Sequence, residues 1–229
     1  MVDKLYQNIN ISVNSELFLK DPESSELGKK IVGQGILLID QIGFEKFTFK
    51  KLGAKIKSNE SSIYRYFENK HKFLVYITNW FWGWKEFQLT LSTYGISDRN
   101  MKLLKAIEVV THPVVQDFRF QHINEVALNH IIINESSKSY LTKEVETDNK
   151  EGYFSIYKRL VTRIAEMISE VSSDYQYSLS LSSMILDGAL HQHFLKDHIQ
   201  SITDCSEKKS VSNYFKDLVI NTLKIELNG

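Results

Sequence analysis

The chain has 229 residues, 42% of them hydrophobic, which suits one large domain or a small domain joined to a larger one. Its 28 Lys and Arg balance its 28 Asp and Glu, so the net charge alone indicates neither a nucleic-acid partner nor a membrane partner. The single cysteine, Cys205, excludes an internal disulfide framework and favours a reducing compartment.

The sequence shows no pattern that predicts export or membrane insertion. The first residues lack a basic segment followed by an apolar one, so no secretory signal is predicted. The longest apolar stretch, residues 73–84, is interrupted by Thr78, Asn79 and Gly83 and is too short to span a bilayer. We therefore expect a cytoplasmic protein with no membrane partner.

The charge is unevenly distributed along the chain. Residues 28–72 hold ten basic and four acidic side chains, an excess of six positive charges that the rest of the chain offsets. A basic segment on an acidic body is expected where one part of a protein meets a polyanion. Lysines on a solvated surface are the alternative explanation.

Residues 1–24 read as an N-terminal arm with a weak pattern, closed by Pro22. The first predicted helix covers 26–42, with an apolar stripe that includes Ile31 and Leu38, and ends at Gly43, a residue type common just after a helix. Little of the chain alternates with period two, so we predict an all-α fold.

Three more helices follow at short intervals. Thr48 is suited to cap a short basic helix whose inner face carries Phe49, Leu52 and Ile56. Ser58 or Asn59 precedes a helix predicted to extend through Phe67, and Asn69 precedes a long helix over 70–91. Further helices are predicted at 98–111, 113–134, 136–147, 152–171, 175–197 and 207–226.

The segment at 59–67 has two different faces when placed on a helix. Ile63 and Phe67 lie one turn apart on an apolar face, whereas the opposite side carries Ser61, Ser62, Tyr64 and Arg65. Two short helices joined by a tight turn form a helix-turn-helix, in which the second helix enters the DNA major groove. A hydroxyl or guanidinium on that helix can contact phosphates or base edges.

Residues 31–74, IVGQGILLIDQIGFEKFTFKKLGAKIKSNESSIYRYFENKHKFL, resemble the DNA-binding domain of the TetR family of transcriptional regulators. The similar features are Ile31 with Gly43 twelve residues later, Thr48, the pair Leu52 and Gly53, the segment Ile63–Tyr64–Arg65–Tyr66–Phe67, and Lys70. The rest of the chain matches this family only in length and helical character.

The resemblance implies an N-terminal three-helix helix-turn-helix domain and a larger C-terminal helical domain for ligand binding and dimerisation. We place the arm at 1–24, the DNA-binding domain at 25–72 and the helical domain at 73–229. The DNA contacts implied are Thr48, Lys50, Ser61, Ser62, Tyr64, Arg65 and Lys70. The implied partners are a pseudo-palindromic duplex operator, a small-molecule effector and a second copy bound through about 175–197 and 207–226.

Three positions depart from the family pattern, one of them Ser58, where the family has an aliphatic residue. Lys57 stands where the family has a turn glycine, and a lysine in a left-handed conformation costs of order 1 kcal/mol, which favours a turn of different shape. Glu60 can accept a hydrogen bond from cytosine or repel phosphates.

Aromatic side chains at Trp80, Trp84, Phe118, Phe154 and Tyr157 are candidates to line an effector pocket, although a packed core would use the same residues. The histidines, among them His191, His193 and His198, lack metal-ligand spacing, so we predict no metal site. The apolar stripes at 175–197 and 207–226 fit a dimer interface or an internal core.

No phosphate-binding loop or nucleophile–base motif is present, so the sequence predicts neither an enzyme nor a cofactor. The function expected is a ligand-responsive, sequence-specific DNA-binding regulator, more specifically a repressor released by a hydrophobic or amphipathic effector. The alternative is a helical interaction protein of the same fold that has lost specific DNA binding.

Overall fold

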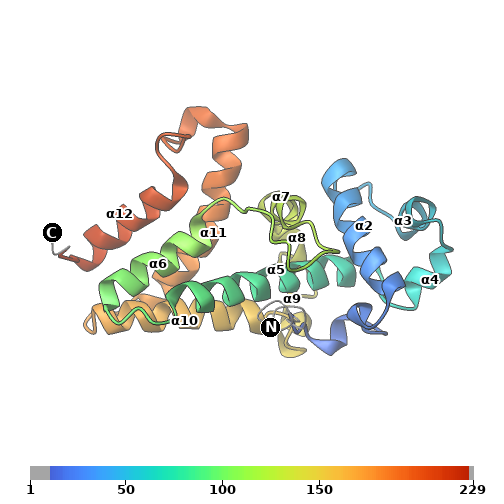
Figure 1. Cartoon of the computed structure of the whole chain (residues 1–229), viewed down its shortest axis with the longest axis horizontal. Helices are drawn as coiled ribbons and strands as arrows, with labels where there is room; N and C mark the ends of the chain where they lie inside the picture. Colours follow the sequence, from blue (N-terminus) through green and yellow to red (C-terminus); the bar gives the residue numbers. More distant parts are fainter. Residues whose placement is uncertain (1–10, 227–229) are drawn as a thin grey trace. The chain divides into compact units, whose positions relative to one another are not determined.

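The computed structural model describes residues 11–226, which are helical and contain no strand (Figure 1). They divide into two compact units. Unit 1 comprises the described residues through Gly83 together with Val114–Ile156, and unit 2 comprises Trp84–Pro113 and the described residues from Tyr157 onward. No helix within the described range is long and apolar enough to cross a membrane.

Unit 1 begins with the last part of the predicted arm; its first ten residues lie outside the described residues. This segment forms two short 3₁₀ helices, η1 (Ser15–Leu17) and η2 (Pro22–Ser24). Leu17 is fully buried, and the Leu19 amide donates to the carbonyl of Tyr66 at 2.8 Å. The arm is therefore folded against unit 1 from residue 11 onward.

Helix α2 (Glu26–Ile42) matches the predicted first helix at both ends. Ser25 caps it by accepting from the amide of Gly28, and Gly43 ends it with a positive φ of 77°. A glycine adopts this conformation without steric cost, which is why the helix stops there. Its buried face, including Ile31, Val32 and Ile36, faces the core of unit 1.

Helices α3 (Phe49–Ile56) and α4 (Glu60–Tyr64) pack against each other, and α3 also packs on α2. The prediction for α3 is confirmed, including the cap in which Thr48 Oγ1 accepts from the Lys51 amide at 3.2 Å. Helix α4 is shorter than predicted because the Tyr66 amide bonds the Ile63 carbonyl, closing a tight turn before Phe67.

Helix α5 (Lys70–Thr93) begins where Asn69 Oδ1 accepts from the Lys72 amide at 2.8 Å, as expected for a cap. Its N-terminal part completes an aromatic core. Phe73 meets Phe67 edge-to-face at 5.0 Å between ring centroids and stacks with Phe47 at 5.5 Å. These buried rings hold α2, α3 and α4 in one unit, each contributing roughly 2–3 kcal/mol by burial.

Three helices complete unit 1: α7 (Glu125–Glu135), α8 (Ser137–Tyr140) and α9 (Val145–Lys150). The predicted helix over 113–134 was wrong for its first half, since residues 113–124 are not helical. That segment is held by side-chain bonds across a loop instead, as Gln116 Nε2 donates to the carbonyl of Ile123 and to the carboxylate of Glu125. The predicted helix over 136–147 was also wrong as a single element, because residues 141–144 interrupt it.

Unit 2 contains the C-terminal part of α5 with α6 (Arg99–Thr111), most of α10 (Ser155–Val171), α11 (Ser178–His198) and α12 (Val211–Leu223). Helix α12 packs on both α6 and α11. The helices predicted at 98–111, 152–171, 175–197 and 207–226 are all present, with ends shifted by at most four residues. The all-α prediction is thus confirmed for the part of the chain that the structure describes.

Candidate nucleic-acid interface

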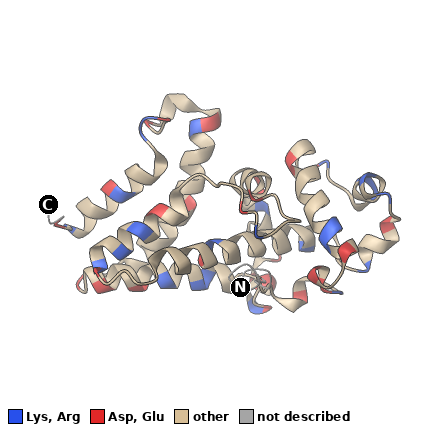
Figure 2. Ribbon diagram, in the orientation of Figure 1, with Lys and Arg blue, Asp and Glu red and all other residues tan. Residues whose placement is uncertain are grey.

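The outer surface of α3 and α4 is basic and accessible. Figure 2 shows the Lys residues of α3 along its ribbon. The exposed side chains in this region include Lys50, Lys51, Lys55, Lys57, Ser61 and Arg65. The inner sides of the same helices carry Leu52, Ile56 and Ile63, each at most 2% exposed. The amphipathic pattern read from the sequence therefore places cations and hydroxyls on one accessible surface.

The turn between α3 and α4 retains the shape that a glycine would give it. Lys57 has φ 57° and ψ 46°, in the left-handed region, and its amide closes the end of α3 on the carbonyl of Ala54. The Ser58 amide bonds the Gly53 carbonyl at 2.9 Å. The expectation of a turn with a different shape was wrong, because these two bonds compensate for the strain of a side chain at this position.

Gly53 permits the close approach of the two helices. A Cβ at this position would lie 2.8 Å from the carbonyl oxygen of Ser58 and 3.3 Å from the amide nitrogen of Glu60. The turn backbone therefore passes directly over α3, which brings the N-terminus of α4 beside it. This contact fixes the angle at which α4 leaves the turn.

The ring of Tyr64 is held in place although its hydroxyl end is accessible. It packs edge-to-face on the buried ring of Phe49, with 5.1 Å between centroids, and the side chain remains 46% exposed. Such a ring loses little freedom when its hydroxyl binds a phosphate. Arg65, the next residue, forms no hydrogen bond or ion pair with the described residues and is exposed.

Lys70 has an internal role in this structure. Its Nζ donates to the carbonyls of Phe44 at 3.3 Å and Glu45 at 3.4 Å, and it lies 4.7 Å from the centroid of the Phe44 ring. These contacts join the start of α5 to the segment between α2 and α3. The phosphate contact predicted for Lys70 stays a prediction, since it would have to coexist with these bonds.

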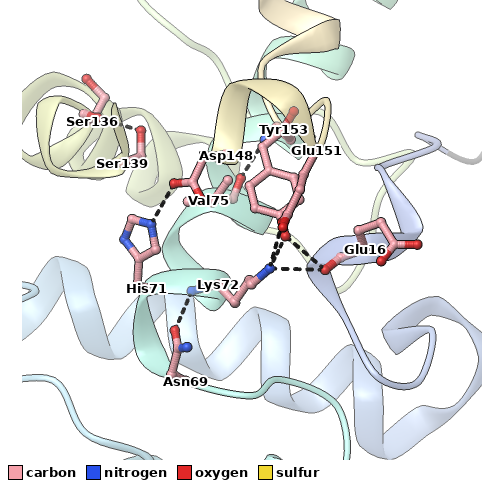
Figure 3. Close-up of polar contacts among 11 residues, drawn as sticks. Glu16, Asn69, His71, Lys72, Val75, Ser136, Ser139, Asp148, Glu151 and Tyr153 are labelled. Atoms are coloured by element: carbon pink, nitrogen blue, oxygen red, sulfur yellow. Dashed lines mark hydrogen bonds and ion pairs between the residues drawn. The ribbon is translucent and has the colours of Figure 1, made fainter. Parts of the chain in front are cut away.

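The next two residues of α5 form a polar junction with the segment around α9 (Figure 3). His71 Nε2 lies 3.3 Å from the buried carboxylate of Asp148. Lys72 Nζ contacts the hydroxyl of Tyr153, the carbonyl of Glu16 at 3.4 Å and the carboxylate of Glu151 at 3.7 Å. Burial and the neighbouring Glu151 carboxylate raise the pKa of Tyr153, so its hydroxyl stays protonated at neutral pH.

A second set of polar contacts joins the segment between α2 and α3 to α7 and α8. The amide of Phe44 donates to Glu135 Oε1 at 3.1 Å, and Lys138 forms ion pairs with Glu135 at 2.7 Å and Glu45 at 2.9 Å. Hydrogen bonding to Lys138 lowers the pKa of Glu45. The helix-turn-helix is therefore fixed to the remainder of unit 1 at both of its ends.

The five residues predicted for an effector pocket have different environments. Trp80 is 1% exposed and meets Phe120 edge-to-face at 5.2 Å, and Trp84 is 4% exposed, so both are packed among other side chains. Phe118 is 84% exposed, and Phe154 is half-buried. In unit 2, Tyr157 donates from its hydroxyl to Asp187 at 2.9 Å. Their role in ligand binding stays a prediction.

Unit 2 buries two basic side chains against backbone carbonyls. Lys85 Nζ donates to the Val109 carbonyl at 3.1 Å, and burial lowers the pKa of this amine to about 8. His193 Nε2 lies 2.9 Å from the Thr111 carbonyl, and burial lowers its pKa as well. His191 stacks near Phe194. Within residues 11–226, no group of three side chains is placed to hold a metal ion.

Sequence reasoning missed two kinds of residue. Lys51, Lys55 and Lys57 were recognised as basic but were not assigned to the interface, although their helical positions make them exposed with Lys50. The junction formed with Asp148 and Tyr153 was not predicted at all. These residues lie more than 70 positions from their partners, and no local pattern marks such a pairing.

Comparisons with known proteins identify the fold. No family model matches the chain, and no curated protein matches it by sequence. Three solved structures are similar in fold at low sequence identity. AibR in complex with isovaleryl coenzyme A and operator DNA is 17% identical with a TM-score of 0.55, covering 83% of this chain and 95% of its own. Apo AibR is 13% identical with a TM-score of 0.51, covering 84% of this chain and 96% of its own.

The superantigen PfiT is 14% identical with a TM-score of 0.57, covering 88% of this chain and 97% of its own. AibR is a regulator of the TetR family. The similarity extends over most of the chain, beyond the 31–74 segment that carries the sequence resemblance. The chain has the all-α fold of the TetR family of regulators.

Proposed function

We propose that this protein is a dimeric, ligand-responsive regulator that binds a specific duplex DNA sequence. The observation that carries the proposal is the left-handed turn at Lys57, which joins α3 and α4 in a helix-turn-helix whose outer surface is basic. A second helix that presents its N-terminal residues in this way fits the major groove. The fold shared with AibR, solved with operator DNA, supports this role.

On this proposal, the exposed side chains have two different tasks. Lys50, Lys55 and the Tyr64 hydroxyl contact phosphates, which positions the protein without reading sequence. Ser61 on α4 and Arg65 directly after it reach base edges, where a guanidinium can pair with both acceptors of a guanine. Thr48 has its Oγ1 engaged as the cap of α3, so its hydroxyl hydrogen remains for a phosphate.

Dimerisation through α11 and α12 is the second part of the proposal. The apolar stripes of these helices divide into two groups in the structure. Leu186, Val211 and Phe215 are at most 2% exposed and belong to the core of unit 2. Leu179 and Tyr214 are 59% and 47% exposed, and such large apolar side chains favour a protein partner. A two-fold dimer would present two copies of α4 to half-sites about one DNA turn apart.

The effector is proposed to be a hydrophobic or amphipathic molecule bound by the C-terminal helical domain, residues 73–229. Binding of the effector is proposed to release the protein from DNA. AibR was solved with isovaleryl coenzyme A as well as with operator DNA, which supports an effector that combines apolar and charged parts. Release requires only that the effector bind more tightly to a conformation in which the spacing of the two α4 helices no longer matches the half-sites of the operator.

In vitro selection from a random duplex library, using the purified full-length protein at two salt concentrations, tests the proposal. We expect enrichment of a two-fold symmetric motif, with binding that weakens as salt rises because phosphates are neutralised by lysines. If no motif is enriched at either concentration, the proposed sequence-specific function is wrong.

The second candidate is a helical interaction protein of the same fold. The similarity to PfiT, a superantigen, favours it, because that protein carries this fold under a different functional description. Glu60 at the start of α4 adds a negative charge beside the proposed interface. Weak, salt-sensitive binding to all duplexes without an enriched motif would favour this candidate over the regulator.

A further inference from the structure

Unit 1 contains a pocket that the helix-turn-helix does not explain and whose lining includes only one of the five predicted effector residues, Phe118. It has a volume of about 470 Å³, within the range of small-molecule sites, and lies between α2 and the non-helical segment 113–124. Helix α2 contributes Lys29, Lys30 and Gln34, and the segment contributes Gln116, Phe118 and Gln121. Both sides belong to the same unit.

The lining of this pocket favours an anion. Lys30 is exposed and has no ion-pair partner among residues 11–226, and Lys29 has only a long 3.6 Å contact with the almost fully exposed Glu26. The amides of Gln34 and Gln121 form no hydrogen bond with the described residues, so both can donate to a ligand. No carboxylate is among the lining residues.

Apart from Glu26, the acidic groups nearest in sequence to the lining residues are already engaged. Asp117 accepts two bonds from Arg119, at 2.7 and 2.6 Å, and Glu23 pairs with His122 at 2.8 Å. Glu125 is fully buried, and burial raises its pKa to about 7. Lys30 therefore remains without an ion-pair partner among the described residues, and Lys29 has only the 3.6 Å contact with Glu26.

Phe118 gives the pocket an apolar rim. Its ring is 84% exposed, whereas Phe120, two residues later, is 5% exposed and packed against Trp80. A phenyl ring left in water beside two cations and free amide donors suits a flat apolar group on the same ligand. The sequence had assigned Phe118 to an effector site together with Trp80, but the two residues do not share an environment.

We infer that the pocket between α2 and residues 113–124 is a binding site for a small aromatic carboxylate. The carboxylate lies between Lys29 and Lys30 with Gln34 as a donor, and the ring packs on Phe118. This site goes beyond the proposed function, since it lies in unit 1 and does not involve the interior of unit 2.

The position of the pocket connects it to the helix-turn-helix. Gly33 of α2 lies so close to segment 113–124 that a Cβ there would overlap the carbonyl oxygen of His122. A ligand held by both sides braces α2, the first helix of the DNA-binding motif, against this segment. Occupancy is thus expected to stabilise unit 1.

The test is a titration of the full-length protein with 4-fluorobenzoate, followed by fluorine-19 NMR line width in the absence of DNA. Two probes separate the parts of the ligand: 4-fluorobenzyl alcohol has the ring without the charge, and fluoroacetate has the charge without the ring. The pocket variants are Phe118→Ala and the double variant Lys29→Gln/Lys30→Gln. Their matched controls are Tyr94→Ala, since Tyr94 is 88% exposed, and the double variant Lys208→Gln/Lys209→Gln, which removes two adjacent exposed lysines; all three residues are in unit 2.

We expect saturable binding of 4-fluorobenzoate that each pocket variant weakens about threefold or more, with both control variants equal to wild type. The two single-feature probes should bind more weakly than 4-fluorobenzoate. The inference is overturned if binding is not saturable, if the pocket variants bind as wild type does, or if the uncharged probe binds equally well. Because no DNA is used, the result is independent of whether the protein recognises an operator.

Discussion

Replacing Lys57 by glycine tests the geometry of the turn between α3 and α4. The backbone of Lys57 is left-handed, at φ 57° and ψ 46°, where a side chain costs roughly 1–2 kcal/mol and glycine none. Glycine also makes the unfolded chain more flexible, and this offsets about 0.4–1 kcal/mol of the stability gained by removing the strain. Lys57→Ala retains the strain and removes the same charge, so it is the matched reference.

We expect Lys57→Gly to be more stable than Lys57→Ala by about 0.5–1 kcal/mol, or roughly 1–4 °C in melting temperature. Urea unfolding followed by tryptophan fluorescence and far-UV circular dichroism measures the difference. Lys224, which ends α12 at φ 53°, provides a second site where the same pair of substitutions should give the same order. A Lys57→Gly protein no more stable than Lys57→Ala would refute the left-handed turn.

Three other changes test the packing of unit 1. Gly33→Ala places a methyl group against the His122 carbonyl and should lower the free energy of unfolding by about 1–3 kcal/mol in urea; an unchanged value would contradict the close approach. Burial raises the pKa of Glu125 to about 7 from an ordinary value of 4.5, so the folded state keeps a proton that the unfolded state loses. The contribution of Glu125 to the free energy of unfolding should therefore be greatest below pH 4.5 and fall by at most about 3 kcal/mol as the pH rises to about 7. Glu125→Gln should remove this pH dependence from the free energy of unfolding. An unchanged pH dependence in that variant would show that Glu125 ionises normally. Lys70→Met removes two hydrogen bonds and a cation–ring contact and should cost about 1–2 kcal/mol of stability; weaker DNA binding without this loss would instead assign Lys70 to a phosphate.

The elements that could be predicted from sequence are those whose ends are set by local chemistry. Ser25, Thr48 and Asn69 each cap the helix that follows directly, by accepting from the amide three residues later. Gly43 ends α2 through its own backbone conformation. These signals depend only on neighbouring residues, so they are visible in the sequence. The apolar periodicity of α11 and α12 is local in the same sense, although it could not distinguish the internal core from an exposed surface.

The features that were missed depend on distant residues. Residues 113–124 have enough apolar side chains to resemble a helix, but bonds to Glu125 and the packing of Phe120 on Trp80 hold them in an irregular path. The pocket lined by Lys30 and Phe118 likewise arises only when two segments more than 70 residues apart meet. At the left-handed Lys57, by contrast, two local backbone hydrogen bonds, to the carbonyls of Ala54 and Gly53, outweigh the conformational preference of a single residue.

The central claim is that the exposed surface of α4 reads DNA sequence, and the most direct measurement compares Arg65→Ala with Arg99→Ala on the duplex obtained by selection. Arg99 lies in unit 2, where its guanidinium donates to the Glu170 carbonyl, so it controls for the loss of one positive charge. The account predicts that Arg65→Ala weakens binding to the selected duplex by ~1–3 kcal/mol and relaxes the preference at one base position, with Arg99→Ala equal to wild type. Equal affinity and equal base preference in the Arg65→Ala and wild-type proteins would contradict it.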